Sequence, residues 1–243
     1  MCAKVMGVVN VTPDSFSDGG QFFKPEEAVR RARNLIADGA DIIDLGGEST
    51  RPGAEPLDWE EEWARIEPVL AALAGGATPL SVDTYHPETA ARAITAGAKI
   101  VNCVSAEAVP TMLELLVGND VELVVPFRPE DAERTAGDAK WRAVAARLYL
   151  DPMIGFGTTR EEDLALLRAV PELAKRGRVL VGASRKRIVK KLTGEKLTGK
   201  NVGGNLGIAV WCALNGASVV RVHDVKETAQ ALKVVEALAE LKS

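Results

Sequence analysis

The sequence is poor in cysteine and aromatic residues, and it contains no long apolar run. Its three cysteines, Cys2, Cys103 and Cys212, are far apart and form no CxxC pair. This usage disfavours a structural zinc site and is typical of a reducing compartment. No apolar run approaches the roughly 18 residues that span a bilayer, and no secretory leader opens the chain. We therefore expect a cytoplasmic protein that does not bind a membrane.

The chain also lacks a strong excess of charge of either sign. Its formal net charge is −4, spread along the sequence, and only 5% of its residues are aromatic. Neither a general attraction to nucleic acid nor a platform for stacked bases is therefore expected. The 243 residues are 47% hydrophobic, which is enough for a sizeable core without disulfides or metal. We expect one domain over residues 1–243.

Short apolar runs alternate along the chain with longer amphipathic ones. The runs that predict strands are residues 4–9, 41–45, 78–82, 99–102, 122–125, 146–150, 178–181 and 218–221. The segments with helical period are residues 25–37, 59–74, 87–96, 109–117, 132–145, 160–176, 186–216 with a break, and 225–241. The segment 132–145 is the weakest of these, since Gly137 interrupts it, so we expect a shortened or irregular fifth helix.

Eight strand and helix pairs in about 250 residues predict an α/β protein with a (β/α)8 TIM barrel fold. A doubly wound sheet is the alternative, and it is disfavoured because no GxGxxG motif follows an early strand. Three helices end in a Gly-Ala pair just before a strand, as a left-handed helix cap requires. In a barrel of this kind the active site lies at the carboxyl ends of the strands.

Polar residues follow seven of the eight predicted strands. They are Asn10, the run 46–53, Asp83, Asn102, Asp151, the triplet Ser184-Arg185-Lys186, and the pair Arg221 and His223. A single polar residue of this kind is often only a helix cap or a turn residue. Because all seven would meet at one rim of the barrel, we interpret them together as a binding site.

The chemistry of this set suggests a polar heterocycle with an anionic tail. Asp83, Asn102 and Asp151 offer two carboxylates and an amide to a ring with several N–H donors, and Lys186 supplies a cation. Arg221 and His223 are two apart on one strand, so they face the same side and suit a phosphate or diphosphate. His86 precedes a proline at a helix start, and we interpret it as a structural residue.

Six segments resemble, in family order, motifs of the dihydropteroate synthases of the pterin-binding barrel superfamily. They are MGVVNVTPDSFSDGG (6–20), DIIDLGGESTRPGA (41–54), SVDTY (81–85), DPMIGFG (151–157), VGASRK (181–186) and RVHDV (221–225). The family condenses hydroxymethyl-dihydropterin diphosphate with para-aminobenzoate, giving dihydropteroate and diphosphate in folate synthesis. The resemblance therefore implies a transferase whose substrates are a pterin diphosphate and an arylamine.

The resemblance also implies a role for each matching residue. The pterin would be held by Asp83, Asn102, Asp151 and Lys186. The diphosphate would be held by Asn10, Thr50, Arg221 and His223, with a Mg²⁺ cofactor near Asn10. The arylamine pocket would comprise Phe16, Thr50, Pro52, Phe156 and Ser184. The residues expected to take part in catalysis are Asp18, Arg51, Lys186, Arg221 and His223.

This chemistry needs stabilisation of a departing anion more than it needs a strong base. Loss of diphosphate leaves a delocalised cation on the pterin, which Arg221, His223 and Mg²⁺ would favour by preorganised electrostatics. The first two loops would close over the site and exclude water. No covalent nucleophile is assigned, since nothing in the sequence indicates that Cys103 is activated.

The chain departs from the family pattern at several places. Cys103 stands where an Asp is usual, residues 125–129 replace a Met-His-Met-Arg-Gly run, Met153 replaces a Gly, and Thr158 replaces a Lys. Two alternatives to the synthase therefore stay open. One is a related enzyme that uses another arylamine or a reduced pterin as methyl carrier, and the other is a non-catalytic pterin-binding barrel. A homodimer is expected from the family, and the apolar stretch 208–214 is interpreted as core.

Overall fold

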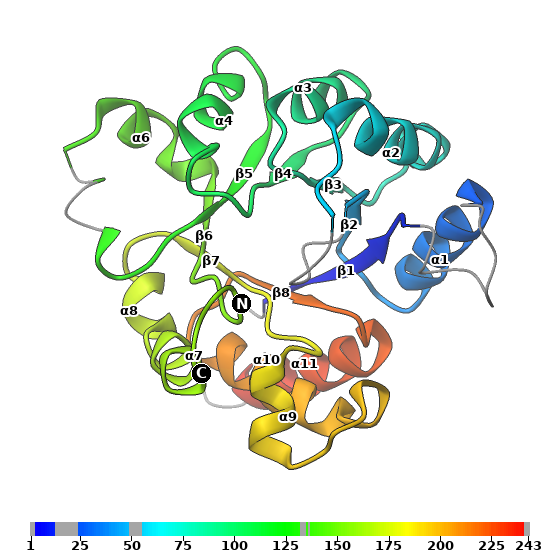
Figure 1. The fold of residues 1–243 in the computed structure, drawn as a ribbon. Coiled ribbons are helices and arrows are strands. Elements are labelled where there is room, and N and C mark those ends of the chain that lie inside the picture. Colours follow the sequence, from blue (N-terminus) through cyan, green and yellow to red (C-terminus); the bar gives the residue numbers. More distant parts are fainter. Residues whose placement is uncertain (1–2, 13–23, 49–54, 132–134, 136, 241–243) are drawn as a thin grey trace.

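In the described part of the chain, eight parallel strands pair in sequence order and close into a barrel (Figure 1). The computed structural model describes residues 3–12, 24–48, 55–131, 135 and 137–240. The strands are β1 (Lys4–Asn10), β2 (Ile42–Gly46), β3 (Leu80–Asp83), β4 (Ile100–Asn102), β5 (Glu122–Pro126), β6 (Leu148–Asp151), β7 (Arg178–Val181) and β8 (Val219–Val222). The pairing of β8 with β1, in which Val219 lies opposite Lys4, closes the ring. The predicted (β/α)8 barrel is confirmed.

Helices surround this barrel (Figure 1). Their bounds are α1 (Pro25–Ala37), α2 (Trp59–Leu73), α3 (Pro87–Thr95), α4 (Val109–Leu115), α6 (Ala139–Val144), α7 (Arg160–Arg168), α8 (Val170–Ala174), α9 (Arg187–Thr193), α10 (Val202–Leu214) and α11 (Val225–Glu240). Helix α1 shows why they form: Pro25 opens its first turn, and Ala28, Ala32 and Leu35 recur at helical spacing on its buried face.

Two long predicted helices are each divided in the structure. The segment 160–176 forms α7 and α8, and Pro171 is the second residue of α8. Proline has no amide hydrogen to donate and its ring displaces the preceding turn, so a single straight helix cannot continue through it. The segment 186–216 forms α9, which ends at Gly194, a short 3-10 turn over Thr198–Lys200, and α10.

The fifth unit is as short as the sequence predicts. Helix α6 has six residues and is followed directly by a 3-10 turn over Ala145–Arg147. It begins at residue 139 because the Asp138 carboxylate accepts from the backbone N–H groups of Lys140 at 2.8 Å and Trp141 at 3.1 Å. Residues 132–134 and 136 of the predicted helix lie outside the described residues.

The predicted left-handed caps are confirmed at Gly39, Gly97 and Gly216, whose φ angles are 103°, 103° and 93°. Each is followed by an alanine and then by a strand, so these turns return the chain from the outer helices to the barrel.

The barrel interior is filled by one apolar residue from each of seven strands. This inner apolar layer comprises Met6, Ile42, Ile100, Val124, Tyr149, Leu180 and Val219, all buried. A larger apolar core lies between the outer face of the strands and the helices. Side chains alternate between the two faces of a strand, so residues two positions after this layer face the interior at the carboxyl end of the barrel.

Some apolar side chains of α10 and α11 lie on the surface. In α10, Ala209 and Cys212 are buried, whereas Trp211 is 38% exposed and Leu214 is 63% exposed. The interpretation of the whole stretch 208–214 as core is therefore wrong for these two residues. Among the helices that the structure describes, none is both long enough and apolar enough to cross a membrane.

Candidate functional site

A layer of polar side chains lies directly beyond the inner apolar layer. It contains Asp44, Asn102, Asp151 and Arg221, each two residues after a member of the apolar layer on the same strand, together with Asp83 at the end of β3. Asp44, Asn102 and Asp151 are 7% exposed or less. Hydrogen bonds join Asp44, Asp83, Asn102 and Arg221 into one group at the carboxyl end of the barrel, and Asp151 interacts with Arg221 through charge. This end is where (β/α)8 enzymes have their active sites.

Arg221 is the centre of this polar layer. Its Nε donates to Oδ2 of Asp44 at 2.6 Å, and its Nη2 donates to Oδ2 of Asp83 at 2.7 Å. Asn102 completes the group, since its Nδ2 donates to the same Asp44 oxygen at 3.1 Å. Strands β2, β3, β4 and β8 are therefore cross-linked by charge-assisted hydrogen bonds, which are stronger than those between neutral groups.

Three acceptor atoms of the polar layer have no hydrogen-bond partner among the described residues. They are Oδ1 of Asp44, Oδ1 of Asp83 and Oδ1 of Asn102, and all three are buried. Buried polar atoms are nearly always paired in folded proteins, so an unpaired set calls for a ligand or water. Acceptors of this kind match the N–H donors of a pterin edge.

Burial shifts the pKa of two carboxyls in the polar layer, Asp83 and Asp151. It raises the pKa of Asp83 to about 7, with the charge of Arg221 opposing and that of Asp44 adding to the effect. Burial likewise raises the pKa of Asp151, and the nearby charge of Lys186 opposes this rise. The polar layer therefore contains an acid that changes charge close to neutral pH, as is common at functional sites.

Lys186 lies beside these carboxyls, directly after the β7 loop. Burial lowers the pKa of its ammonium to about 8, and the carboxylate of Asp151 is the strongest influence in the opposite direction. The Nζ atom donates to the backbone oxygen of Ile154 at 2.6 Å and lies 4.2 Å from the centre of the Phe156 ring. The structure thus groups Lys186 with Asp83, Asp151 and Phe156.

His223 and Ser184 form a second group at the same rim. The two meet through His223 Nδ1 and Ser184 Oγ at 3.2 Å, and the His223 amide also donates to that hydroxyl at 3.3 Å. Arg221, which the sequence groups with His223, has its guanidinium turned toward Asp44 and Asp83. The structure therefore joins Arg221 to the expected pterin residues and joins His223 to Ser184.

The remaining predicted residues are Asn10 and five residues that follow β1 or β2 in the sequence. Asn10 is the last residue of β1 and is half-buried opposite Gly46 of β2, at the carboxyl end of the barrel. Phe16, Asp18, Thr50, Arg51 and Pro52 lie outside the described residues. In the described part of the chain no cluster of three or more His, Cys, Asp or Glu side chains could hold a metal.

Sequence reasoning missed Asp44. Its signal was available, because it is the single charged residue inside the apolar strand IIDLG, and alternation places it on the same face as Ile42. A fully buried carboxylate within a barrel strand needs a charged partner, and Arg221 provides it.

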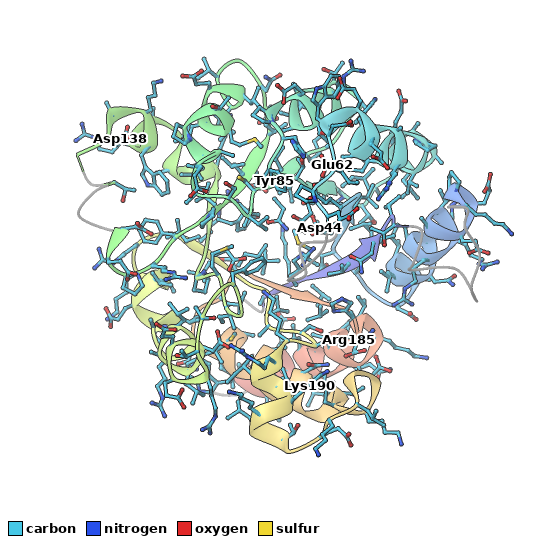
Figure 2. The ribbon with its side chains drawn as sticks, in the orientation of Figure 1. Asp44, Glu62, Tyr85, Asp138, Arg185 and Lys190 are labelled. Atoms are coloured by element: carbon cyan, nitrogen blue, oxygen red, sulfur yellow. The ribbon has the colours of Figure 1, made fainter. Side chains whose placement is uncertain are left out.

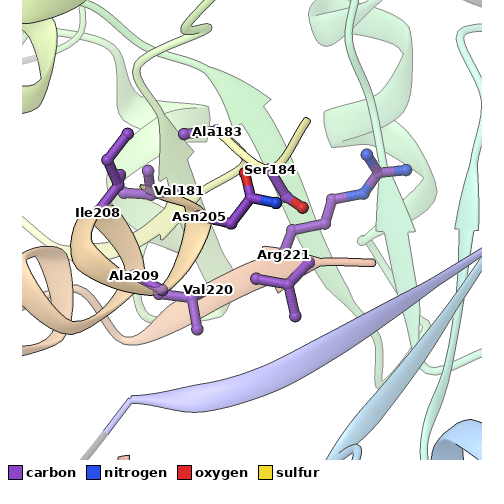
Figure 3. A pocket seen from close by; sticks show the side chains of 9 residues that line it. Val181, Ala183, Ser184, Asn205, Ile208, Ala209, Val220 and Arg221 are labelled. Atoms are coloured by element: carbon purple, nitrogen blue, oxygen red, sulfur yellow. The ribbon is translucent and has the colours of Figure 1, made fainter. Parts of the chain in front are cut away.

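A further contact that the sequence did not reveal connects Arg185, Asn205 and Asp224. Arg185 has a left-handed backbone (φ 61°), and its Nη2 pairs with Asp224 Oδ1 at 2.6 Å. Asn205 of α10 accepts from the Arg185 amide at 3.0 Å and donates to Asp224 at 2.8 Å. A cavity of about 10 Å³ lies beside Asn205, Ser184 and Arg221 (Figure 3). This volume is close to the minimum for one water molecule.

Another polar cluster connects α2 with the residues that follow β2 and β3, and Figure 2 labels two of its members, Glu62 and Tyr85. The Thr84 hydroxyl donates to buried Glu62 at 2.6 Å, and Tyr85 donates to Glu48 at 2.7 Å. His86 is the residue before α3, and its Nε2 lies 3.5 Å from Glu48. These contacts agree with a structural role for His86.

Cys103 is buried at the end of β4 and shows no sign of activation. Its thiol donates to the Ser105 backbone oxygen at 3.3 Å, and burial raises the pKa of the thiol to about 11. A thiol of this kind is poorly nucleophilic, because the thiolate is the reactive form.

Comparisons with known proteins agree with this geometry. The family described as pterin binding enzymes matches residues 6–223. The dihydropteroate synthase of Neisseria meningitidis serogroup B is 40% identical, over 97% of this chain and 92% of its own length. The dihydropteroate synthase of Xanthomonas albilineans, solved with 4-aminobenzoic acid, is 39% identical with a TM-score of 0.85, covering 98% of this chain and 93% of that one.

A second structure of the Xanthomonas albilineans protein, in complex with 7,8-dihydropteroate, is 36% identical with a TM-score of 0.82. It covers 98% of this chain and 94% of that one. The match thus extends over nearly all of both chains, and the two folds agree closely. The chain belongs to the dihydropteroate synthases of the pterin-binding enzyme family.

Proposed function

We propose that this protein condenses hydroxymethyl-dihydropterin diphosphate with para-aminobenzoate to give dihydropteroate and diphosphate. The observation that carries the proposal is the set of buried, unpaired acceptors of Asp44, Asp83 and Asn102, beside the cation of Lys186. A pterin presents several N–H donors and ring acceptors along one edge, which is the chemistry complementary to this set. The named relatives are dihydropteroate synthases, and one was solved with the product 7,8-dihydropteroate.

The reaction exchanges one bond at the methylene carbon of the pterin. The carbon–oxygen bond breaks and its electron pair leaves with the diphosphate, while the arylamine nitrogen forms the new carbon–nitrogen bond and loses a proton. The pterin stabilises the cationic carbon by delocalisation. Asp83 and Asp151 hold the pterin N–H groups, and Lys186 donates to a ring acceptor, so the methylene group is fixed toward the rim.

Arg221 and His223 are proposed to bind the departing diphosphate. His223 lies at the amino end of α11, whose first-turn N–H groups favour an anion. Thr50, from the loop after β2, is proposed as a further diphosphate contact. The proposed arylamine pocket comprises Phe16, Thr50, Pro52, Phe156 and Ser184, and Asp18 and Arg51 are proposed to take part in catalysis.

Asn10 fits as one protein ligand of a Mg²⁺ ion. Its amide offers a hard oxygen at the rim, and Mg²⁺ keeps several waters and is bound largely by substrate phosphates instead of an all-protein cage. When bound, the ion would neutralise charge on the leaving diphosphate. We also propose a single domain over residues 1–243 and a homodimer, for which the exposed Trp211 and Leu214 offer apolar surface.

The test is diphosphate release by the purified protein with the pterin diphosphate and Mg²⁺, with and without para-aminobenzoate. Release that depends on the amine and yields dihydropteroate is the expected result. Asp151→Asn is the matched variant, and it should reduce release strongly because the pterin loses a charged acceptor.

Two outcomes would contradict the proposal. Pterin binding without diphosphate release, whatever arylamine is supplied, would favour a non-catalytic barrel. Release that requires a different amine acceptor would favour a related enzyme of the same family.

A further inference from the structure

One buried carboxylate close to the site has no part in the chemistry described so far. Asp163 of α7 is completely buried, and its Oδ1 accepts from the Thr158 hydroxyl at 2.5 Å and from the Gly155 amide at 2.7 Å. The Gly155 amide also points at the Thr158 hydroxyl, at 3.1 Å. Burying a carboxylate is costly unless hydrogen bonds or charges compensate for it, so its presence in an outer helix requires an explanation.

Asp163 holds the loop that joins β6 to α7. The loop carries two contacts to Lys186: the Ile154 carbonyl, 2.6 Å from Nζ, and the Phe156 ring, whose centre lies 4.2 Å from Nζ. Gly155 lies between these two residues and is bound to Asp163 through its amide. The three consecutive residues therefore connect the buried carboxylate to the lysine ammonium.

The loop also packs closely on the stem of Lys186. A Cβ added at Gly155, which has a φ of 78°, would lie 2.9 Å from Cδ of Lys186. Arg187, the next residue, donates from Nη2 to the Thr158 carbonyl. Helices α7 and α9, which begin after Thr159 and Lys186 respectively, pack against each other (Figure 1). The position of the lysine thus depends on how this loop is held.

We propose that Asp163 is a positioning residue for Lys186, which it acts on through the β6–α7 loop. Thr158 is the second member of this unit, and it stands where the family pattern has a lysine. The carboxylate fixes the loop by two hydrogen bonds, and its negative charge favours the ammonium form of the lysine. The inference rests on the proposed function only for the role of Lys186 in binding the pterin.

The charge of Asp163 is one of several that act on the pKa of Lys186. Its neighbours are the carboxyls of Asp151, Asp83 and Asp163, and the guanidinium of Arg221. Burial lowers the pKa of Lys186 to about 8, the three carboxyls raise it and Arg221 lowers it further. Loss of the Asp163 charge therefore moves the pKa of Lys186 down and leaves less of the ammonium form at neutral pH.

Two substitutions separate the hydrogen bonds from the charge. Asp163→Asn keeps a side-chain oxygen for Gly155 and Thr158 and removes the charge, with its NH2 group replacing Oδ2, which has no hydrogen-bond partner among the described residues. Asp163→Ala removes both the charge and the hydrogen bonds. Glu161→Gln is the control, because it removes the same charge from the same helix at an exposed side chain, which lies 3.7 Å from the Arg160 guanidinium.

The first measurement is the pKa of Lys186 itself, by NMR titration of protein labelled at the lysine ε-carbon, with the signal assigned by its loss in Lys186→Arg. We expect a lower pKa in Asp163→Asn than in wild type and no change in Glu161→Gln. An unchanged pKa in Asp163→Asn would overturn the charge part of the proposal, and this result does not depend on what reaction the protein performs.

The second measurement is kcat/KM for the pterin diphosphate across pH. In Asp163→Asn the alkaline fall in kcat/KM should begin at lower pH, since Lys186 loses its proton sooner. In Asp163→Ala, kcat/KM should fall by ~10–100-fold at every pH, because the loop no longer fixes the lysine. Equal values for Asp163→Ala and Glu161→Gln would overturn the proposal.

Pterin binding, followed by the intrinsic fluorescence of the pterin, separates this inference from the proposed function. If wild type binds a pterin without turnover, the synthase activity fails, yet the positioning role still predicts weaker binding in Asp163→Ala. A folded Asp163→Ala protein that binds the pterin as tightly as wild type would refute the positioning role.

Discussion

Each end of the barrel contains an arginine that forms an ion pair with a carboxylate. The two ends differ in which buried atoms have no hydrogen-bond partner. At the amino end, Arg178 of β7 pairs with Oε1 of Glu122, while Tyr149 donates to the other oxygen of Glu122 at 3.1 Å. The Arg178 guanidinium also stacks on the Tyr149 ring at 4.0 Å. At the carboxyl end, Arg221 pairs with Asp44 and Asp83.

The carboxylates at the two ends differ in whether both of their oxygens are paired and in how exposed their side chains are. Both oxygens of Glu122 are paired and its side chain is 34% exposed, whereas Asp44 and Asp83 each keep a buried oxygen without a partner among the described residues. At the amino end the buried atoms without a partner among the described residues are the donors Nε and Nη2 of Arg178. Its ion pair with Glu122 is partly screened by water, because both side chains are about one-third exposed. The carboxyl-end cluster instead leaves buried acceptor oxygens open, which is the arrangement expected of a site for a ligand with N–H donors.

The largest effect that would test this comparison is expected for Arg221→Ala. The variant removes the cation that pairs with the buried carboxylates of Asp44 and Asp83. The fall in kcat/KM for the pterin diphosphate should therefore correspond to a loss of about 2–4 kcal/mol in transition-state stabilisation. Steady-state kinetics beside Arg178→Ala provides the check. Unchanged kinetics in Arg221→Ala would remove this residue from the site, and an equal loss in both variants would end the distinction between the two ends.

Asp44→Asn should have the next largest effect. The substitution keeps the size of the side chain but replaces the ion pair with Arg221 by a hydrogen bond from the charged guanidinium to a neutral amide oxygen. The resulting fall in kcat/KM should be worth about 1.5–3 kcal/mol. Glu122→Gln makes the same change at the amino end. If Asp44→Asn binds a pterin as tightly as Glu122→Gln does, Asp44 has no role in holding Arg221 for the ligand.

The pH dependence of stability sharpens the comparison for Asp83. Burial raises its pKa from 3.8 to about 7, so the folded protein binds this proton more tightly than the unfolded chain. Its contribution to the free energy of unfolding is full below pH 3.8 and is lost as the pH rises toward 7. Asp83→Asn lacks this dependence.

Urea unfolding of wild type and Asp83→Asn across this pH range measures the effect. The stability of wild type relative to the variant should fall with rising pH and become constant above about pH 7. A parallel pH dependence in the two proteins would show that Asp83 titrates as it does in the unfolded chain.

The smallest effect is expected for Arg178→Ala. Loss of a partly exposed ion pair and a cation–π contact should lower the free energy of unfolding by about 1 kcal/mol. The KM for the pterin diphosphate should stay unchanged, since no residue of the polar layer contacts Arg178. A raised KM with unchanged stability would mean that the amino end takes part in binding.

Much of the fold was predictable from the sequence. The strand bounds differ from the prediction by two residues or fewer, because each barrel strand is a short apolar run between turn residues. The division at Pro171 was missed, although a proline inside a helical pattern is a known break. The sequence also placed Asp83, Asn102, Asp151, Lys186 and Arg221 at the correct end of the barrel.

The partners of those residues were not predictable. Arg221 and His223 share a strand end and were grouped together, yet Arg221 contacts Asp44, which is 177 residues away in sequence. Asp163 lies within an ordinary acidic first turn of a helix, and nothing in its neighbourhood distinguishes it from Glu161 and Glu162. The structure distinguishes Asp163 from these two glutamates, because its side chain is completely buried and bonded to the β6–α7 loop.

The eight-unit barrel, the end of the barrel that carries the polar site and the family of the protein can all be predicted from the amino-acid sequence. These follow from periodicity and short motifs, which depend on neighbouring residues. The tertiary structure alone decided which carboxylates hold Arg221, which acceptors stay open for a ligand and how Asp163 reaches Lys186. Such pairings depend on closure of the barrel, because closure brings residues from distant strands into a buried group where charges interact strongly.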